Sequence, residues 1–166
     1  MRRQTIDNMM NPAQVKHPMI RVHGTSVALA GEGVLIRGPS GSGKSDLALR
    51  LIDEGARLIA DDQTELRRVG GTVRLSAPAE IAGLLEVRGL GIIRMPSAGA
   101  PLRLVVDLVA EDQPIERMPE AASCELAGLA FPLLLVHPFA ASAPAKLRWA
   151  LKGLGEPLAF GALAAR

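Results

Sequence analysis

Residues 38–45 read GPSGSGKS and match the pattern GxxxxGK[ST]. Glycines in this pattern let successive backbone N–H groups turn inward and surround phosphate oxygens. Lys44 is expected to reach the β- and γ-phosphates of a nucleotide, and the hydroxyl of Ser45 is expected to bind Mg²⁺. The apolar run VLIRG precedes the motif and an amphipathic run follows it, which is the strand–loop–helix setting that such a loop needs. The predicted phosphate-binding residues are Gly38, Pro39, Ser40, Gly41, Ser42, Gly43, Lys44 and Ser45.

A loop of this kind needs an acidic side chain at a strand end to hold Mg²⁺ or its water ligands. Asp61 and Asp62 end the short apolar run RLIA, which follows the expected loop and helix. Two adjacent carboxylates point in different directions, so one can face the metal and the other an acceptor hydroxyl. We expect their strand to lie beside the strand that precedes the loop. The alternative is Asp107, after the run RLVV, which we expect only to end or interrupt a strand.

A third polar feature is EVRGLGII at residues 86–93, in which Glu86 and Arg88 precede two glycines. Glycine within a strand costs backbone entropy and packs nothing, so Gly89 and Gly91 need a reason. One interpretation is a bend that brings the backbone close to a phosphate or to an incoming partner. The other is a β-bulge that carries a surface ion pair.

Hydrophobic periodicity predicts the elements that must position these residues. A helix is expected from Lys44, with Leu47, Ala48, Leu51 and Ile52 on one face and Gly55 as its stop. Alternating strands and helices with one hairpin indicate an α/β fold, a mixed β-sheet flanked by helices. The other expected elements are two strands within 20–38 split by a turn at 31–33, a strand at 56–60, a hairpin over 64–76, strands at 84–87, 91–95, 102–109 and 131–138, and helices over 119–130 and 142–155.

Composition narrows the class of protein. With 166 residues, 48% apolar and 22% charged, the chain can form one globular domain, for which we expect a flexible leader over 1–18 and a catalytic domain over 19–166. A net charge of +2 without a basic run, and only 2% aromatic residues, argue against nucleic-acid binding. The single cysteine, Cys124, excludes an internal disulfide and is expected to be a small buried side chain. With no membrane-spanning run and no signal peptide, a cytoplasmic location is expected.

Four blocks together resemble the catalytic domain of HPr kinase/phosphorylase, the enzyme that phosphorylates a serine of the phosphocarrier protein HPr. They are RVHG around His23, GPSGSGKS, RLIADD and LEVRGLGII, in the order and spacing of that family, and they cover roughly residues 20–117. The resemblance implies a phosphate-loop α/β fold similar to the kinase core of phosphoenolpyruvate carboxykinase. It also implies ATP and Mg²⁺ as cofactors, HPr or a nitrogen-related HPr-like carrier as partner, and a homo-oligomer, by family habit a hexamer.

The resemblance also implies roles for single residues. Lys44 would bind phosphate, Ser45 and Glu86 would hold Mg²⁺, and Asp62 would be the acid/base. His23 and Arg117, the latter in the weaker match IERMP, would assist in catalysis. Arg88 would lie on the side of Glu86 because side chains in a strand repeat every two residues. The supporting residues are Asp61, Arg88, Gly89 and Gly91.

The chain departs from the family in two places. Only the short leader precedes the first block, where family members carry an N-terminal domain, so a short form is expected. The family's Arg-Pro-Gly-Arg-Asn block, connected with dephosphorylation, is replaced by LVHPFAASAPAKL, which argues against the reverse, phosphorolytic activity more than against the kinase activity. Two other functions stay open: a small-molecule kinase or NTPase that depends on Asp107, and a regulatory module that senses ATP without turnover.

Overall fold

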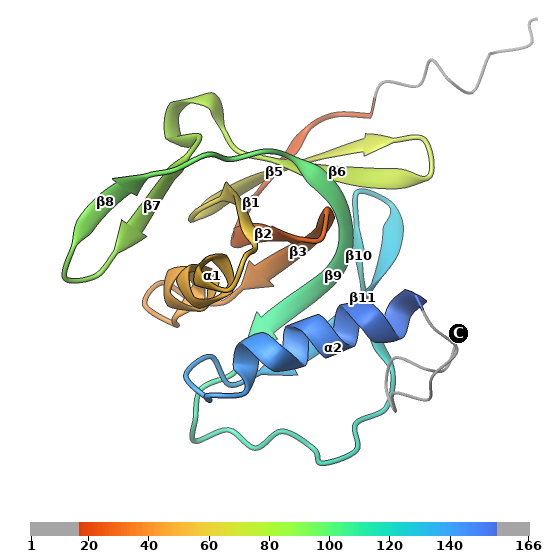
Figure 1. Cartoon of the computed structure of the whole chain (residues 1–166). Coiled ribbons are helices and arrows are strands. Elements are labelled where there is room, and N and C mark those ends of the chain that lie inside the picture. Colours follow the sequence, from red (N-terminus) through yellow and green to blue (C-terminus); the bar gives the residue numbers. More distant parts are fainter. Residues whose placement is uncertain (1–16, 156–166) are drawn as a thin grey trace, which may run out of the picture.

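The structure, a computed structural model, describes residues 17–155, which contain a curved mixed sheet, a separate hairpin and two long helices (Figure 1). In chain order the elements are β1 (Ile20–His23), β2 (Thr25–Leu29), β3 (Glu32–Arg37), α1 (Lys44–Asp53), β4 (Arg57–Ala60), β5 (Gln63–Val69), β6 (Thr72–Ser76), a 3-10 helix (Ala79–Ile81), β7 (Leu84–Val87), β8 (Gly91–Arg94), β9 (Ala100–Leu108), β10 (Ala122–Leu126), β11 (Leu129–Val136) and α2 (Ala143–Gly155). The expected α/β class with a mixed sheet flanked by helices is confirmed.

The middle of the sheet brings the carboxyl ends of four strands to one edge. Its strand order is β11-β9-β3-β2-β4, in which β11, β9 and β3 are mutually parallel. Strand β2 is antiparallel to both of its neighbours, so β4 runs in the direction of β3. The carboxyl ends of β11, β9, β3 and β4 therefore share one edge, which is where ligands bind in open α/β sheets. We had expected β4 directly beside β3, but β2 lies between them.

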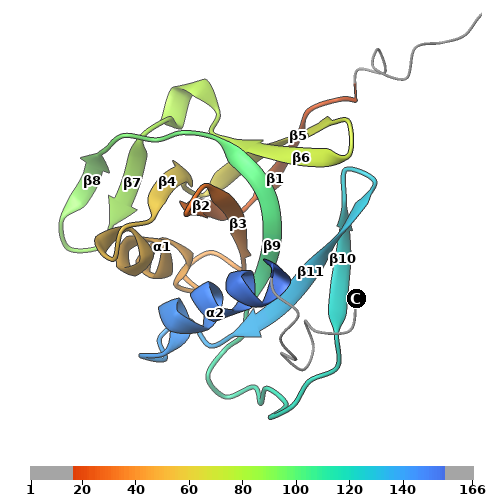
Figure 2. The same ribbon diagram turned by 45° about the vertical axis from the view of Figure 1, so that its right-hand side comes forward.

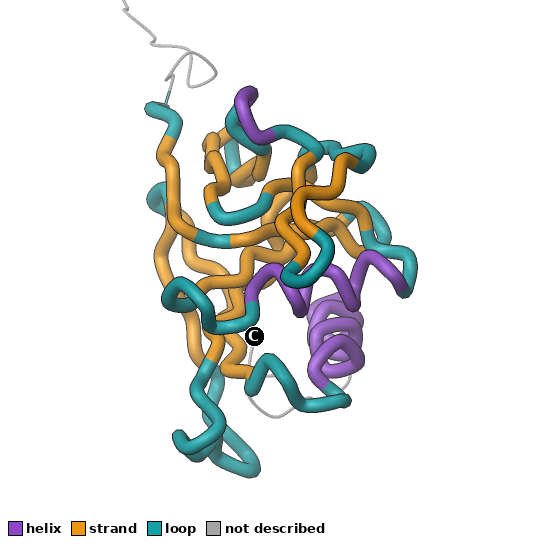
Figure 3. Tube along the Cα trace, turned by 90° about the vertical axis from the view of Figure 1, so that its left-hand side faces the viewer, coloured by secondary structure: helices purple, strands orange, loops and turns teal. Residues whose placement is uncertain are grey.

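Both helices cover one face of this sheet (Figure 3). Leu47 and Leu51 of α1 pack with Leu147 of α2 and with Ile36 and Val106 of the sheet, and all five side chains are fully buried. This burial confirms the predicted apolar face of α1. The helix ends at Asp53, and Gly55, two residues later, has a φ of 105°, the left-handed conformation of a glycine stop.

The opposite face of the sheet is covered by a second part of the same sheet, β1, β5 and β6, seen at the top of Figure 1 and turned in Figure 2. Strand β9 is long enough to pair with β3 and β11 and, at its first residues, with β6. The buried side chains between the two layers include Leu35, Leu66, Leu75 and Val105. The predicted hairpin of β5 and β6 around Gly70 is confirmed and supplies this cover.

The hairpin of β7 and β8 forms a sheet of its own. Its inner residues Leu85 and Val87 pack with Leu58 of β4 and, on α1, with Leu49 and Ile52. Apolar contact therefore holds this hairpin beside α1 and the end of β4, although no ladder hydrogen bonds join it to the main sheet.

Two sequence predictions about the elements are wrong. The segment 20–38 forms three strands, because the chain breaks at Gly24, where a Cβ would lie 3.0 Å from the carbonyl oxygen of Ile36. The segment 119–130 is not a helix but contains β10 and the start of β11. Its alanines favour a helix, but Ala127 and Gly128 adopt positive φ angles of 50° and 76°, which makes a tight hairpin turn. Pairing along the ladder then outweighs local helix propensity.

The predicted closing helix is confirmed as α2, which begins directly after Ser142. The predicted leader falls almost entirely on residues 1–16, outside the described range. Within residues 17–155, no helix is long and apolar enough to span a bilayer.

Candidate active site

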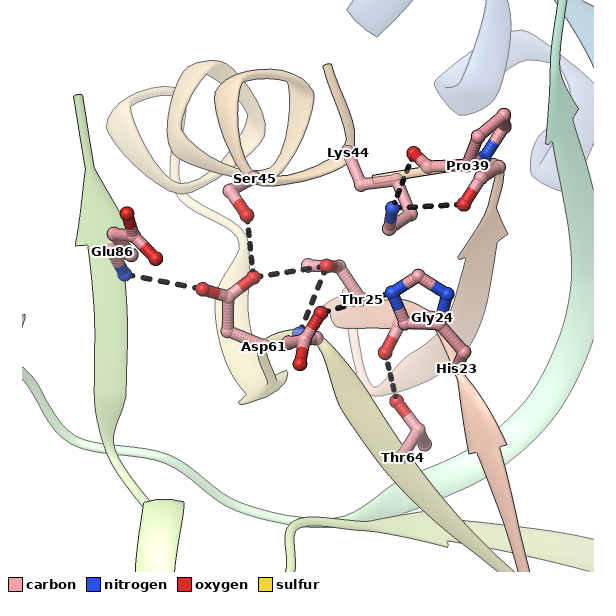
Figure 4. A network of polar contacts seen from close by, with 11 residues as sticks. His23, Gly24, Thr25, Pro39, Lys44, Ser45, Asp61, Thr64 and Glu86 are labelled. Atoms are coloured by element: carbon pink, nitrogen blue, oxygen red, sulfur yellow. Dashed lines mark hydrogen bonds and ion pairs between the residues drawn. The ribbon is translucent and has the colours of Figure 1, made fainter. Parts of the chain in front are cut away.

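The phosphate loop, residues 38–45, connects β3 to α1 at the shared edge of the sheet. Gly43, at the start of α1, has a φ of 99°, which a side chain would disfavour. Lys44 is only 6% exposed, and its ammonium group donates hydrogen bonds of 2.8 Å to the carbonyls of Gly38 and Pro39 (Figure 4). Burial lowers the pKa of Lys44, while the nearby charges of Asp62 and Asp61 oppose that shift. The loop therefore holds a cation directly at the helix N-terminus, where anions bind.

Asp61 connects three segments of the site. Its Oδ1 accepts hydrogen bonds from the hydroxyls of Ser45, at 2.7 Å, and Thr25, at 2.9 Å. Its Oδ2 accepts the backbone N–H of Glu86 at 3.1 Å. The residue is 7% exposed, so these contacts replace the water that a carboxylate would otherwise bind. Asp61 therefore joins the phosphate loop, β2 and β7, as Figure 4 shows.

Asp62 is placed differently, with 68% of its side chain exposed. Its φ of 63° is left-handed, a conformation that aspartate tolerates better than most residues. Its N–H donates to Thr25 Oγ1 at 3.2 Å, its carbonyl accepts the N–H of Gly24 at 2.8 Å, and the N–H of Gln63 donates to the Asp61 carbonyl at 2.7 Å. These bonds hold a sharp turn that directs one aspartate inward and the next outward.

His23, the last residue of β1, is the partner of Asp62. Its Nε2 lies 2.9 Å from Asp62 Oδ1 and, when protonated, donates a hydrogen bond to that oxygen (Figure 4). The ladder between β1 and β5 pairs His23 with Gln63, the residue after Asp62, and this register brings the two side chains together. The sequence-predicted His23 and Asp62 therefore meet at the site.

Glu86 lies on the exposed side of β7, next to Asp61 through its own backbone amide. It lines, with Asp61, Asp62 and Arg21, a pocket of about 430 Å³, which Asp61 connects to the phosphate loop through its hydrogen bond with Ser45. A pocket of about 520 Å³ between the carboxyl ends of α1 and α2 is larger but contains none of these groups. The smaller pocket is therefore the candidate site.

The oxygen groups at this pocket suit a magnesium ion. Mg²⁺ prefers hard oxygen ligands and commonly takes one or two carboxylates together with phosphate oxygens and waters. The Ser45 hydroxyl and the Asp61 carboxylate are already in contact, and Glu86 adds a second carboxylate. Within residues 17–155 no group of three or more His, Cys, Asp or Glu side chains forms a metal site on its own. A site in which the protein supplies only some of the ligands and bound phosphates supply the others fits both the available oxygen groups and the lack of such a cluster among the described residues.

The segment after Glu86 forms a turn. Strand β7 ends at Val87, and Arg88, which follows it directly, is exposed as Glu86 is, so its placement on the side of Glu86 stays a prediction. Gly89 and Gly91 have φ angles of 88° and 100°, and the N–H of Leu90 donates to the Val87 carbonyl at 2.9 Å. The glycines thus make a hairpin turn rather than a bulge. A Cβ on either would meet nothing within 4 Å, so the backbone angle, and no close approach within this chain, requires glycine.

Asp107 is already paired. Arg37, the last residue of β3, donates from Nε at 2.7 Å and from a terminal nitrogen at 2.9 Å to its two carboxylate oxygens. Hydrogen bonding to Asp107 raises the pKa of the Arg37 guanidinium. Because Val106 packs toward the helices, Asp107 points to the opposite face of the sheet, as Val105 does. Cys124 packs on that face; it is half-buried rather than buried as expected, and desolvation raises its thiol pKa.

Arg117 does not join the site. It lies exposed in the loop between β9 and β10, and within the described residues it has no hydrogen-bond or ion-pair partner. That loop follows the carboxyl end of β9, so it leaves the same edge of the sheet as the phosphate loop.

Sequence reasoning missed three buried hydroxyl groups beside the site, of which that of Thr25 contacts both aspartates. Thr25 and Ser26 are fully buried in β2, and Thr64 is fully buried at the start of β5. The Thr64 hydroxyl donates to the Gly24 carbonyl and contacts the Ser26 hydroxyl, both at 2.9 Å. Two adjacent hydroxyl residues in an otherwise apolar strand were the available signal, because buried polar groups need partners. Sequence reasoning also gave Asp61 a supporting role, whereas it is the residue that contacts Ser45.

Comparison with known proteins places the chain in a family. The family model described as HPr Serine kinase C-terminal domain matches residues 16–120. The chain is 43% identical over 95 residues to HPr kinase/phosphorylase of Clostridium novyi, and 50% identical over 80 residues to that of Clostridium tetani. These matches cover 57% and 48% of this chain but only 31% and 26% of the relatives, so the chain matches about a third or less of their length.

A solved structure, that of the Hpr(Ser) kinase/phosphatase from Coxiella burnetii, has the same fold. It superposes with a TM-score of 0.70 at 26% sequence identity, over 80% of this chain and 88% of that chain. With the family model covering more than half of the sequence, this chain belongs to the HPr serine kinase C-terminal domain family.

Proposed function

We propose that this chain transfers the γ-phosphoryl group of ATP to a serine of HPr or of an HPr-like carrier in a reaction that needs Mg²⁺. The relatives are named HPr kinase/phosphorylase, and the solved neighbour is named an Hpr(Ser) kinase/phosphatase. The observation that carries the proposal is that the turn after β4 presents one aspartate to the phosphate loop and the next aspartate to solvent. Asp61 bonds the Ser45 hydroxyl of the phosphate loop, while Asp62, the next residue, is exposed and bonded to His23.

The phosphate loop supports binding and orientation of ATP. Its N–H groups and the N-terminus of α1 receive the phosphates, and Lys44 has only weak neutral partners, two carbonyls, to exchange for phosphate oxygens. Ser45, Asp61 and Glu86 would hold Mg²⁺, and the ion would neutralise charge that develops on the transferred group. Asp61 has a positioning role besides, because it fixes the Ser45 hydroxyl and the backbone of β7 together.

Asp62 would act on the acceptor. A serine hydroxyl is a weak nucleophile, and a carboxylate in reach takes its proton as the oxygen attacks the γ-phosphorus. The bond between the γ-phosphorus and the bridging oxygen then breaks, and ADP leaves. His23 would hold the Asp62 carboxylate in place and stabilise its charge through the 2.9 Å contact. In the reverse direction, protonated Asp62 would return the proton to the serine oxygen as inorganic phosphate attacks phosphoserine, and pyrophosphate would be released.

The decisive experiment incubates the full chain with labelled ATP, Mg²⁺ and a purified candidate carrier, and scores acid-stable phosphoserine on the carrier. A carrier in which the acceptor serine is alanine, and the variant Lys44→Ala, serve as controls. We expect label on the serine only with Mg²⁺ and wild-type chain. ATP hydrolysis or labelling of small molecules without carrier labelling would favour an NTPase or small-molecule kinase instead. Labelled phosphoserine carrier with inorganic phosphate tests the reverse reaction.

A further inference from the structure

An aromatic side chain lies against the phosphate loop and is used by none of the steps above. Phe139 belongs to the connection between β11 and α2, and it is 56% exposed in a chain with three Phe, one Trp and no Tyr. Single exposed apolar residues are common and carry no meaning by themselves. The position of this one is informative, because a Cβ built on Gly43 would lie 2.8 Å from Cζ of its ring. The ring therefore rests on the last glycine of the phosphate loop.

The segment around Phe139 is fastened to α1. The guanidinium of Arg50 donates hydrogen bonds to the carbonyls of Pro138 and Ala140, on either side of Phe139. The same guanidinium donates to Asp46 at 3.0 Å. Gly43, Asp46 and Arg50 are three and four residues apart and so share one side of α1. Phe139 is thus held along the side of the helix that begins at the phosphate loop.

A second contact fixes the other end of the segment. His137 Nε2 donates to the Gln113 carbonyl at 2.7 Å, which ties the residue before Pro138 to the loop that follows β9. With anchors on both sides, the ring is held at the phosphate loop with little conformational entropy left to lose when a ligand contacts it.

The strand order decides which end of a nucleotide would meet this ring. The phosphate loop follows β3; β4, with Asp61 and Asp62, lies two strands to one side, and β11, with Phe139, lies two strands to the other. Under the proposed function the γ-phosphate faces the Asp62 side, where the Ser45 hydroxyl contacts the Asp61 carboxylate. The α-phosphate, ribose and base therefore leave the loop toward the Phe139 side.

We propose that Phe139 is the stacking platform for the base of the nucleotide. Every base has an aromatic face that can stack on a ring. Such a ring therefore strengthens the binding of any nucleotide that carries a base, and it discriminates only weakly between one purine and another. Phe139 lies in the short connection HPFAAS, residues 137–142, between β11 and α2. We infer that this stretch contributes to nucleotide binding here. The inference rests on the proposed binding of ATP at the phosphate loop.

The test compares ligands with and without a base. Binding of ADP, GDP and tripolyphosphate, each with Mg²⁺, is measured by calorimetry on wild type, Phe139→Ala and Phe139→Trp. Loss of one stacked base weakens affinity by about tenfold or more, so Phe139→Ala should lose that factor for ADP and for GDP. Its affinity for tripolyphosphate should change less than about twofold, and Phe139→Trp should keep wild-type affinities. Leu135→Ala, an exposed apolar residue of β11, is the matched control and should change none of the three.

The outcomes separate this inference from the proposed function. Equal losses for ADP and tripolyphosphate in Phe139→Ala would show that the ring only supports the loop at Gly43, and unchanged ADP affinity would show that it does not contact the base. Either result overturns the stacking role while leaving nucleotide binding in place. Failure of wild type to bind ADP and tripolyphosphate alike would overturn both proposals.

Discussion

Two aspartates at the same edge of the sheet, Asp61 and Asp107, have opposite surroundings. Asp61 follows β4 and accepts hydrogen bonds from two hydroxyls and one amide. Asp107 lies in β9, the strand directly beside the phosphate-loop strand, and both of its oxygens accept from one guanidinium. By distance along the sheet Asp107 is nearer to the strand before the loop, yet it is the aspartate that the loop does not contact.

The difference shows that the partner of a carboxylate decides its availability. The charge of Asp61 is stabilised by neutral groups, and the hydroxyls among them can rotate when a cation arrives. At Asp107 a cation would have to compete with a fixed positive charge within hydrogen-bond distance. The direction of each side chain matters as well, since Asp107 points away from α1, whereas Asp61 points toward the first turn of α1. The generic kinase or NTPase that depends on Asp107 is therefore disfavoured by this geometry.

The largest effect is expected at Asp62. Asp62→Asn removes the proton acceptor but keeps the size of the side chain, so phosphotransfer to the carrier should fall by about 10²–10⁴-fold. ATP affinity should stay within about twofold, because the proposed role of Asp62 is toward the acceptor and not toward the nucleotide. Asp53→Asn, an exposed aspartate at the end of α1, is the control and should leave both quantities unchanged. Retention of the transfer rate in Asp62→Asn would remove the basis for the proposed mechanism.

A smaller effect is expected at Asp61. Asp61→Asn keeps one oxygen for the hydroxyls of Ser45 and Thr25 but loses the negative charge, so the Mg²⁺ concentration for half-maximal transfer should rise about 10–100-fold. A magnesium titration of the transfer rate at saturating ATP measures this shift. An unchanged Mg²⁺ requirement would show that Asp61 only supports the turn.

The smallest effect is expected at Asp107 and concerns stability rather than activity. Asp107→Asn leaves Arg37 without its ion pair, and because both side chains are about a third exposed, at 33% and 30%, we expect a loss of about 1 kcal/mol in the free energy of unfolding. Urea denaturation measures it, and the transfer rate should not change. If Asp107→Asn abolished transfer while Asp62→Asn did not, the catalytic role would belong to Asp107 and the proposed function would be contradicted.

Local features were read correctly where spacing along the chain controls them. The phosphate loop, the apolar face of α1, its glycine stop and the hairpin over 64–76 all depend on contacts between near neighbours in sequence. The 119–130 segment was misread because Ala-rich sequence favours a helix, while the two-residue turn and the ladder with β11 depend on a partner strand.

The sequence by itself determined which residue types are available for phosphate chemistry and that they occur in the order of one family. Only the tertiary structure decided which of them meet. It inserted β2 between β3 and β4, and with it the buried hydroxyl of Thr25 that orients both aspartates. In the folded chain Asp107 is also paired with Arg37, and the ring of Phe139 lies against Gly43. The physical reason is that hydrogen bonds and ring contacts act over a few ångströms, and the partners involved here are separated by up to about a hundred residues in the chain.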